Sequence, residues 1–357
     1  MSFSALELCA GGGGQALGLE LAGFECAGAI ELEPLACETL RKNRPAWNVL
    51  EGDLRNANGR SFRGVDLVAG GVPCPPFSIA GRQLGASDDR DLFPEALRIV
   101  EEAKPRAVIL ENVPGLASQK FKEYRQGVRQ RFESLGYSVE WRVLQSADFG
   151  VPQLRPRFIL IALRSPDFKF FQWTAGSSVP PTVGEALGEL MGSAGWKGTS
   201  QWMQRANRIA PTVVGGSKKH GGPDLGPTRA RAQWKELGVD GLGIANEVPN
   251  QGTPIEHLPR LTLRMVARLQ SCPDSWEFAG RKTAAYRQVG NAFPPLAAKA
   301  VGESVMRALQ GRRATLHDSL PEMRLFERGN NQEIQNEHKR IKKEAAGVLA
   351  RERRPNR

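Results

Sequence analysis

The chain opens with a pattern that restricts it to a narrow class of folds. Residues 3–9 (FSALELC) predict a strand, residues 10–14 (AGGGG) a tight turn, and residues 16–22 an apolar helix. A second strand is predicted at 27–30. This order is typical of a parallel α/β sheet in which the backbone approaches a cofactor at a helix N-terminus. The glycine run taken alone is also consistent with a plain tight turn.

Acidic side chains follow the ends of the next two predicted strands. Glu31 follows the strand at 27–30, and Asp53 follows a short strand at 48–51 that comes after a helix at 34–43. An acidic residue at the end of the second strand can accept hydrogen bonds from both hydroxyls of a ribose. Asp53 can accept one from an adenine amino group. Together these residues indicate a nucleoside-cofactor pocket without an obvious pyrophosphate clamp.

Cys74 lies in a turn with few backbone states. Residues 65–69 predict a short buried strand, and residues 70–78 (GGVPCPPFS) follow with proline on both sides of the cysteine. Proline fixes its own φ and restricts the residue before it. Cys74 at the end of a strand is therefore a candidate nucleophile, although a lone cysteine is more often a small buried apolar residue. The polar, glycine-bearing residues 81–91 predict a lid.

Charged residues also lie at two later strand boundaries. Glu111 follows the apolar strand 106–110, and desolvation there raises the pKa of a carboxyl, which suits an acid. A helix-capping or salt-bridged glutamate is the alternative. Arg155 and Arg157 lead into the apolar strand 158–163, where a spacing of two residues points both to the same face. Such a pair fits phosphate or carbonyl recognition, with a solvated surface as the alternative.

The composition restricts partners and location. A net charge of +11 favours a polyanionic partner such as nucleic acid over a cationic surface kept for solubility. No apolar run is long enough to span a bilayer and no signal peptide is evident, so a cytoplasmic protein is expected. The five cysteines are scattered without a C-x-x-C pair and the four histidines form no ligand pattern. Neither a disulfide framework nor a metal site is therefore expected.

The pattern changes along the chain predict four stretches. Residues 1–164 form a catalytic and cofactor-binding domain. Residues 165–280, rich in glycine, proline and basic residues, form a loop-rich target-recognition domain suited to reading base edges, with another kind of interaction insert as the alternative. Residues 281–310 return to the first domain, and residues 311–357 are a charged tail without a catalytic role. Further helices are predicted at 94–103, 121–135, 260–270 and 296–309, and a further strand at 138–144.

Four motifs occur in order along the chain. They are the Pro-Cys turn with Phe77-Ser78, Glu111-Asn112-Val113, Gln153-x-Arg155-x-Arg157, and Gly290-Asn291-Ala292 with the prolines after it. In this order, and together with the glycine turn, they resemble the bacterial cytosine-C5 DNA methyltransferases of type II restriction-modification systems. The matching stretches run from residue 5 to residue 302 except for the basic domain. The resemblance implies an α/β fold with a Rossmann-like methyltransferase sheet and a second, smaller recognition domain.

The resemblance also implies the chemistry. The thiolate of Cys74 would add to C6 of cytosine, so that C5 can attack the methyl group of S-adenosylmethionine. Glu111 would protonate or hydrogen-bond N3, and Arg157 would hold O2 with support from Arg155. Asn112 would help to fix the Pro-Cys turn. The target base would be flipped out of the duplex, and the sequence does not identify the base that removes the C5 proton.

Three positions depart from the usual family pattern. Cys9 replaces a phenylalanine, which thins one wall of the cofactor pocket. Met265 replaces an acidic residue, which puts a salt bridge in doubt, and Pro75 replaces a glutamine. The cofactor residues implied by the resemblance are Cys9, Gly11, Gly13 and Gly14, with Glu31 on the ribose, Leu32 and Asp53 on the adenine, and Asn291 and Ala292 from the far end of the chain.

The implied partner is double-stranded DNA, with a monomer expected and a companion restriction endonuclease as the usual setting. The alternative is a tRNA cytosine-C5 methyltransferase of the same superfamily, which would carry a smaller recognition region. A nicotinamide dehydrogenase shares the glycine turn but does not need the Pro-Cys-Pro-Pro segment. A non-catalytic DNA-binding relative has no support, because Cys74, Glu111 and Arg157 are all present.

Overall fold

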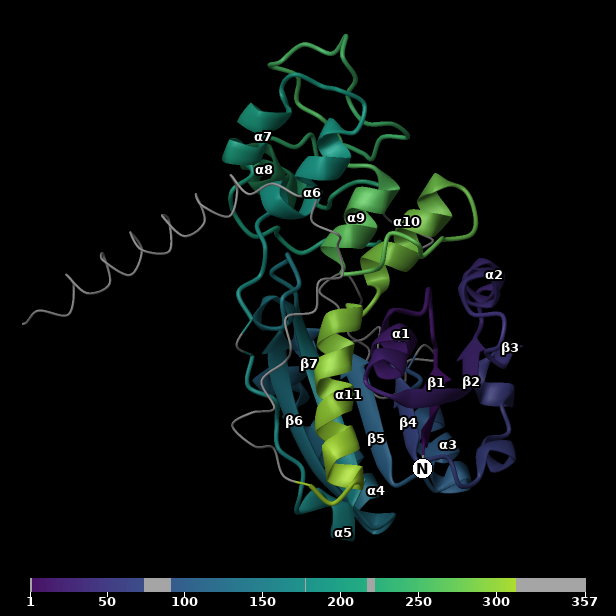
Figure 1. Cartoon of the computed structure of the whole chain (residues 1–357). Helices are drawn as coiled ribbons and strands as arrows, with labels where there is room; N and C mark the ends of the chain where they lie inside the picture. Colours follow the sequence, from purple (N-terminus) through teal and green to yellow (C-terminus); the bar gives the residue numbers. More distant parts are fainter. Residues whose placement is uncertain (1, 74–90, 177, 217–221, 313–357) are drawn as a thin grey trace, which may run out of the picture. The chain divides into compact units, whose positions relative to one another are not determined.

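Seven strands form one sheet in the part of the chain that the structure describes. The computed structural model describes residues 2–73, 91–176, 178–216 and 222–312, all within one compact unit (Figure 1). The strand order is β3-β2-β1-β4-β5-β7-β6; β1 to β5 are parallel, and β7 is antiparallel to β5 and β6. The strands are β1 (Phe3–Leu8), β2 (Phe24–Glu31), β3 (Val49–Glu51), β4 (Leu67–Gly70), β5 (Ala107–Asn112), β6 (Tyr137–Gln145) and β7 (Pro156–Arg164).

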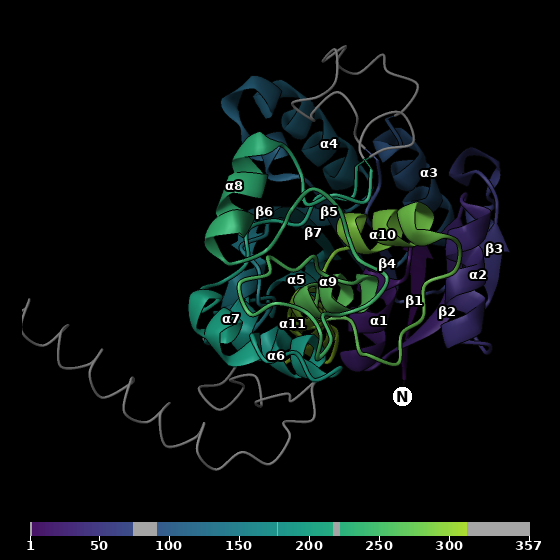
Figure 2. The same cartoon turned by 90° about the horizontal axis from the view of Figure 1, so that it is seen from above.

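Helices cover both faces of this sheet (Figure 2). On one face, α3 (Phe93–Ala103) and α4 (Lys122–Ser134) pack against the alternate residues of the central strands. On the other face lie α1 (Gly14–Leu21) and α11 (Pro295–Leu309). All six residues of β5 are buried, as expected for a strand covered on both sides. α2 (Pro34–Asn43) packs beside β2 and β3.

The last described helix, α11, docks on the first one, α1. Gly18 of α1 makes this approach possible, because a Cβ at that position would lie 2.5 Å from both Ala298 Cβ and Pro295 O of α11. Residues from opposite ends of the chain therefore share one hydrophobic cluster, in which Leu19 and Val301 are both buried.

Residues 165–280 contain short helices joined by loops, with a core of their own. The buried residues Trp196, Trp202 and Trp234 belong to this core. It extends to Tyr286 and Val289 of α10 (Lys282–Asn291), and the domain boundary at residue 280 stays a prediction. The helices of this stretch are α5 (Ser165–Phe168), α6 (Val183–Gly192), α7 (Thr199–Arg205), α8 (Thr228–Glu236) and α9 (Leu263–Leu269).

The predicted elements are present, and their boundaries differ for local reasons. The first strand ends at Leu8 because Cys9 has a φ of 52°, in the left-handed region. The helix predicted from residue 260 begins at Leu263, because the Thr262 side chain accepts a hydrogen bond from Met265 N. The sequence did not predict the 3-10 turns η1 (Leu54–Asn56), η2 (Gly59–Phe62), η5 (Pro114–Ala117), η6 (Gln119–Phe121) and η7 (Ser146–Asp148).

Two further predictions concern α9 and the lid. Met265 is fully buried, and α9 still forms ion pairs, because Arg264 and Arg268 both contact Asp274. Cys74 and the predicted lid, except for Asp91, lie outside the described residues. No helix that the structure describes combines the length and the apolar character needed to cross a membrane.

Candidate active site

Glu111 and Arg157 form a buried ion pair between two adjacent strands. Arg157 Nε lies 2.6 Å from Glu111 Oε1, and each side chain is 11% exposed. Glu111 directly follows the four apolar residues of β5, and Arg157 is the second residue of the neighbouring β7. Burial raises the pKa of Glu111, against the opposing charges of Arg157 and Arg155. The carboxyl is thus both desolvated, as predicted, and salt-bridged, as the alternative had it.

The two residues at the end of β5 contact the segment that leads to Cys74. Asn112 Nδ2 donates to Val72 O at 3.0 Å, and its Oδ1 accepts from Val113 N at 2.9 Å. A Cβ on Gly71 would lie 3.2 Å from Glu111 Oε2, so the backbone passes close to that carboxylate. Glu111 and Asn112 are therefore held beside the residues immediately before Cys74.

Arg155 donates hydrogen bonds to two distant segments of the chain. Its Nη1 donates to Val213 O at 2.7 Å, and its Nη2 donates to Gly290 O at 2.8 Å and Ala292 O at 2.9 Å. The side chain is fully buried. Burial, together with the charge of Arg157, lowers the pKa of Arg155. The solvated-surface alternative is wrong for both arginines, because Arg157 is also buried.

Gln153 is a structural member of the same motif to which the sequence assigned no role. Its Nε2 donates to Gln270 Oε1 at 2.9 Å and Leu269 O at 3.2 Å, while its Oε1 accepts from Val213 N at 2.8 Å. Gln153 is fully buried and connects β7 to α9. Its place in the Gln-x-Arg-x-Arg motif was the only signal that could have found it.

The glycine turn that follows β1 contacts Glu31, the residue expected to bind the ribose, at the end of β2. Cys9, Gly11 and Gly13 all have φ between 52° and 87°, a conformation that is strained for cysteine and easy for glycine. Glu31 Oε2 accepts from Gly11 N at 2.7 Å, and Oε1 accepts from Glu33 N at 2.7 Å. A carboxylate oxygen has a second lone pair, so both oxygens keep the capacity to accept from a ligand.

Residues from the far end of the chain form a wall around this turn. Trp276 Nε1 donates to Gly12 O at 3.0 Å, and a Cβ on Gly13 would lie 2.8 Å from the Trp276 ring. A Cβ on Gly14 would lie 3.0 Å from Ala292 Cβ. Trp276 was missed at the level of sequence. Ala292 thus lies beside the glycine turn, as the sequence analysis expected. Its neighbour Asn291 donates from Nδ2 to Gly216 O at 3.3 Å.

Leu32 and Asp53 follow the ends of β2 and β3. Leu32 is 64% exposed, which leaves an apolar side chain available to a flat ring. Asp53 caps η1: Oδ1 accepts from Arg55 N at 2.9 Å, and Oδ2 pairs with Arg55 Nη1 at 2.9 Å. The backbone hydrogen bond from Arg55 is the main cause that lowers the pKa of Asp53. Gly52 N donates to Glu31 O at 2.9 Å, which keeps the two strand ends together.

A pocket of about 620 Å³ lies beside Asp53, lined by β3 and the residues after it. Neither Glu31 nor Leu32 is among its lining residues. The described residues therefore place Asp53 in the wall of an open space, and Glu31 lies outside this wall, although its backbone oxygen accepts from Gly52 N, which is part of the wall.

The residues around the glycine turn fit S-adenosylmethionine. Among the described residues, no heavy atom lies within 4 Å of the place where a Cβ on Gly11 would be. Gln15 is buried, and neither of its amide atoms has a hydrogen-bond partner within the described structure. Glu31 and Asp53 supply the acceptors that ribose hydroxyls and an adenine amino group require. Open space at Gly11 and the acceptor oxygens of Glu31 thus occur at the same turn, and Asp53 supplies a further acceptor in the wall of the pocket beside β3.

The sequence profile of the family "C-5 cytosine-specific DNA methylase" matches residues 3–307. The chain is 53% identical over 312 residues to the type II methyltransferase M.NaeI of Lentzea aerocolonigenes, which covers 86% of this chain and 76% of the relative. It is 49% identical over 313 residues to the type II methyltransferase M.NgoMIV of Neisseria gonorrhoeae, with coverage of 87% and 99%.

Solved structures agree in fold. A putative DNA modification methyltransferase encoded within an Escherichia coli prophage has a TM-score of 0.62 at 22% identity, covering 87% of this chain and 100% of its own. A variant of Spodoptera frugiperda DNMT2 has a TM-score of 0.59 at 16% identity, with coverage of 85% and 100%. The sheet is that of a Rossmann-like methyltransferase, and the chain belongs to the C-5 cytosine-specific DNA methylase family.

Proposed function

We propose that the chain methylates C5 of a flipped-out cytosine in a specific duplex DNA sequence, through a temporary bond between Cys74 and C6. S-adenosylmethionine is the methyl donor of this family. The observation that supports the proposal best is the meeting of Glu111, Arg157 and Asn112 beside the residues that precede Cys74. Glu111 and Asn112 come from the end of β5, and Arg157 comes from the start of β7.

The proposed reaction passes through a covalent adduct with Cys74. The thiolate of Cys74 would add to C6 and open the C5–C6 double bond, while the carboxyl of Glu111 donates a proton or hydrogen bond to N3. S-adenosylmethionine, when bound, would supply an electrophilic methyl group to C5, and S-adenosylhomocysteine would leave as the methyl–sulfur bond breaks. A base reached through water would then remove the C5 proton, and the C5–C6 double bond would re-form as Cys74 leaves as a thiolate and N3 returns any proton it received to Glu111.

The electrostatics of the pair suit these roles. A proton donor works best when its pKa lies near the operating pH, and burial shifts the pKa of Glu111 upward. Arg157 provides a fixed cation beside that carboxyl and can hold the O2 atom of cytosine. Arg155, which is committed to three backbone carbonyls, supports Arg157 and the backbone around it.

Cofactor binding divides between the two sides of the glycine turn. Gly11, Gly13 and Gly14 approach the methionine portion, and Glu31 accepts from the ribose hydroxyls. Leu32 and Asp53 bind the adenine, while Cys9 forms one wall. Asn291 and Ala292 close the pocket from the far end of the chain, supported by the close approach of Ala292 to Gly14.

Duplex DNA is favoured over tRNA as the substrate. The relatives at 53% and 49% identity are type II methyltransferases. The DNMT2 structure, at 16% identity, is evidence for the fold alone. Residues 165–280 are proposed to recognise the DNA sequence, and the type II names support a companion restriction endonuclease. A monomeric, cytoplasmic protein completes the proposal.

The covalent step is tested with a duplex that carries 5-fluorocytosine at the target position. Fluorine cannot leave as a proton does, so the adduct should persist and run as a crosslinked band after denaturation. Bisulfite sequencing of DNA from cells that express the chain first identifies the target. The crosslink should form with S-adenosylmethionine and map to residue 74.

The variants Cys74→Ser and Cys26→Ser provide a matched pair. Cys74→Ser should lose both the crosslink and methyl transfer, and Cys26→Ser should keep both, because Cys26 lies at the opposite end of β2 from Glu31. Methylation that persists in Cys74→Ser would rule out the covalent mechanism. Transfer to tRNA but not to DNA would favour the alternative substrate.

A further inference from the structure

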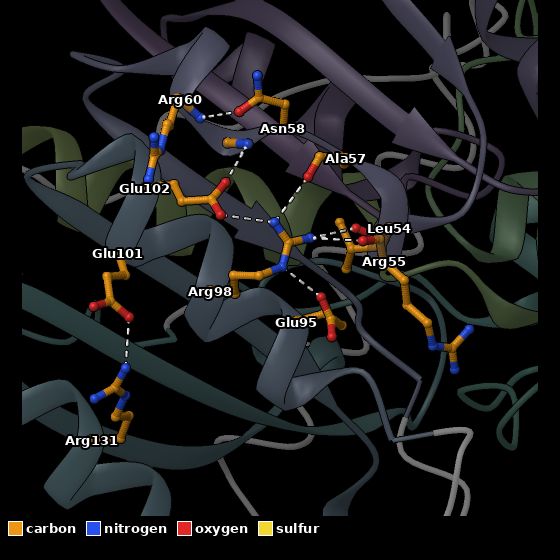
Figure 3. A network of polar contacts seen from close by, with 11 residues as sticks. Leu54, Arg55, Ala57, Asn58, Arg60, Glu95, Arg98, Glu101, Glu102 and Arg131 are labelled. Carbon is orange, nitrogen blue, oxygen red and sulfur yellow. Dashed lines mark hydrogen bonds and ion pairs between the residues drawn. The ribbon is translucent and has the colours of Figure 1, made fainter.

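Arg98 of α3 holds the loop that follows β3 by three backbone carbonyl oxygens. Its Nη1 donates to Ala57 O at 2.9 Å, and its Nη2 donates to Leu54 O at 2.9 Å and Arg55 O at 3.3 Å. Figure 3 shows the guanidinium between the helix and the loop. A planar fork with five donors suits this arrangement, whereas a lysine presents a single point charge.

Two carboxylates of the same helix fix the guanidinium in place. Arg98 Nε donates to Glu95 Oε2 at 2.7 Å, and Nη1 donates to Glu102 Oε1 at 3.1 Å. The other oxygen of Glu102 accepts from Gly59 N at 2.7 Å, so a second contact ties the loop to α3 (Figure 3). Arg98 is only about one-third exposed, which sets this network apart from a solvated surface pair.

The carbonyls that Arg98 binds belong to the turn that Asp53 caps. Leu54 and Arg55 are the first two residues of η1, and the Asp53 side chain accepts from Arg55 N. Ala57, whose carbonyl oxygen is the third acceptor for Arg98, lines the pocket of about 620 Å³ together with Asp53. The orientation of the Asp53 carboxylate therefore depends on a turn whose backbone carbonyls are bound by Arg98.

We propose that Arg98 is a positioning residue for S-adenosylmethionine, which fixes the turn from which Asp53 contacts the adenine. This inference rests on the proposed role of Asp53. Arg98 acts through the backbone of residues 54–57 and not on the reacting atoms. Loss of its contacts should therefore weaken cofactor binding and leave the methyl-transfer step at saturating cofactor unchanged.

The test measures binding of the product S-adenosylhomocysteine by calorimetry, and KM and kcat in the methylation assay. Arg98→Lys should weaken binding and raise the KM for S-adenosylmethionine by about tenfold, the effect of losing one to two hydrogen bonds. The kcat should stay within about twofold of wild type on the same reasoning. Arg131→Ala is the matched control. Arg131 of α4 pairs with Glu101 of α3, the helix that carries Arg98, but both side chains are half exposed.

A double-mutant cycle tests whether the effect passes through Asp53. If Asp53→Asn and Arg98→Lys act on the same contact, their effects on the affinity for S-adenosylhomocysteine should not add. Independent, additive losses would overturn the inference, as would unchanged affinity in Arg98→Lys. An equal fall in kcat and in cofactor affinity would also overturn it, because that result indicates general damage to the fold.

A second variant covers the case in which Arg98→Lys does not fold. Glu102→Gln keeps the size of the side chain and weakens its contacts with both Arg98 and Gly59 N, so a smaller loss of affinity, about threefold, is expected. Wild-type affinity in that folded variant would overturn the inference. Wild-type protein that binds no product would instead refute the proposed function itself.

Discussion

Arg157 Nε lies 2.6 Å from Glu111 Oε1, so a buried ion pair links side chains of two paired strands beside the proposed cytosine site. In a low-dielectric interior, removing one partner leaves the other charge without compensation. The two side chains therefore act as one unit, and a change in either affects both the stability and the chemistry of the site.

Glu111→Gln should reduce turnover by roughly 10²–10⁴-fold, the range for removal of a general acid or base. The amide keeps the size of the side chain and can still accept from Arg157, but it cannot deliver a proton to N3. Methyl transfer at saturating cofactor and DNA is the measurement. Glu101→Gln is the control, because Glu101 of α3 is half exposed and pairs with Arg131 of α4, away from the proposed site. Turnover near that of wild type would exclude the acid role.

Asn112→Ala should lower the free energy of unfolding by about 1–3 kcal/mol, because Val72 O would lose its buried donor. Turnover should fall as well, since Val72 lies two residues before Cys74. Urea unfolding and methyl transfer measure the two effects. A variant with lower stability and full activity would show that this bond does not position the nucleophile.

Gly18→Ala and Gly127→Ala should change stability in opposite directions. A Cβ on Gly18 would meet α11 at 2.5 Å, and overpacking of this kind costs about 1–3 kcal/mol. Gly127 lies on the exposed face of α4, with no heavy atom within 4 Å of a Cβ among the described residues, so alanine should add about 0.5–1 kcal/mol there. Thermal unfolding compares the two. A neutral Gly18→Ala would mean that α1 and α11 separate easily.

The stability contributed by Glu7 should fall as pH rises. Burial, and then the charge of Glu111, raises the pKa of Glu7 well above its usual value. The folded state thus keeps a proton that the unfolded chain releases above roughly pH 4.3. The stabilisation is complete below that pH and is lost as pH rises toward the folded pKa.

The Glu7→Gln variant isolates this effect. The difference in free energy of unfolding, variant minus wild type, should increase between pH 5 and pH 8 in urea titrations. Glu25→Gln is the control for the substitution itself, because Glu25 is exposed on the same sheet. A constant difference for Glu7→Gln would mean that water or a local rearrangement solvates the carboxyl.

The sequence was sufficient to predict the helices and strands and the charged residues at the ends of the strands. Apolar periodicity and turn chemistry are local properties, so β2, α2 and β5 could be predicted within a few residues. The charged residues that follow the strands, Glu31 and Glu111, were identified for the same reason. The burial of Glu111 was predicted from the apolar run before it.

Only the tertiary structure decided which of these residues meet. The partners of Arg155 lie 58 to 137 residues away, and Trp276 contacts a glycine 264 residues earlier. The sequence contains the donors but not their acceptors, because backbone carbonyls are present at every position and carry no sequence signal. Which carbonyl a buried arginine binds depends on how the elements pack, and packing is a property of the whole fold.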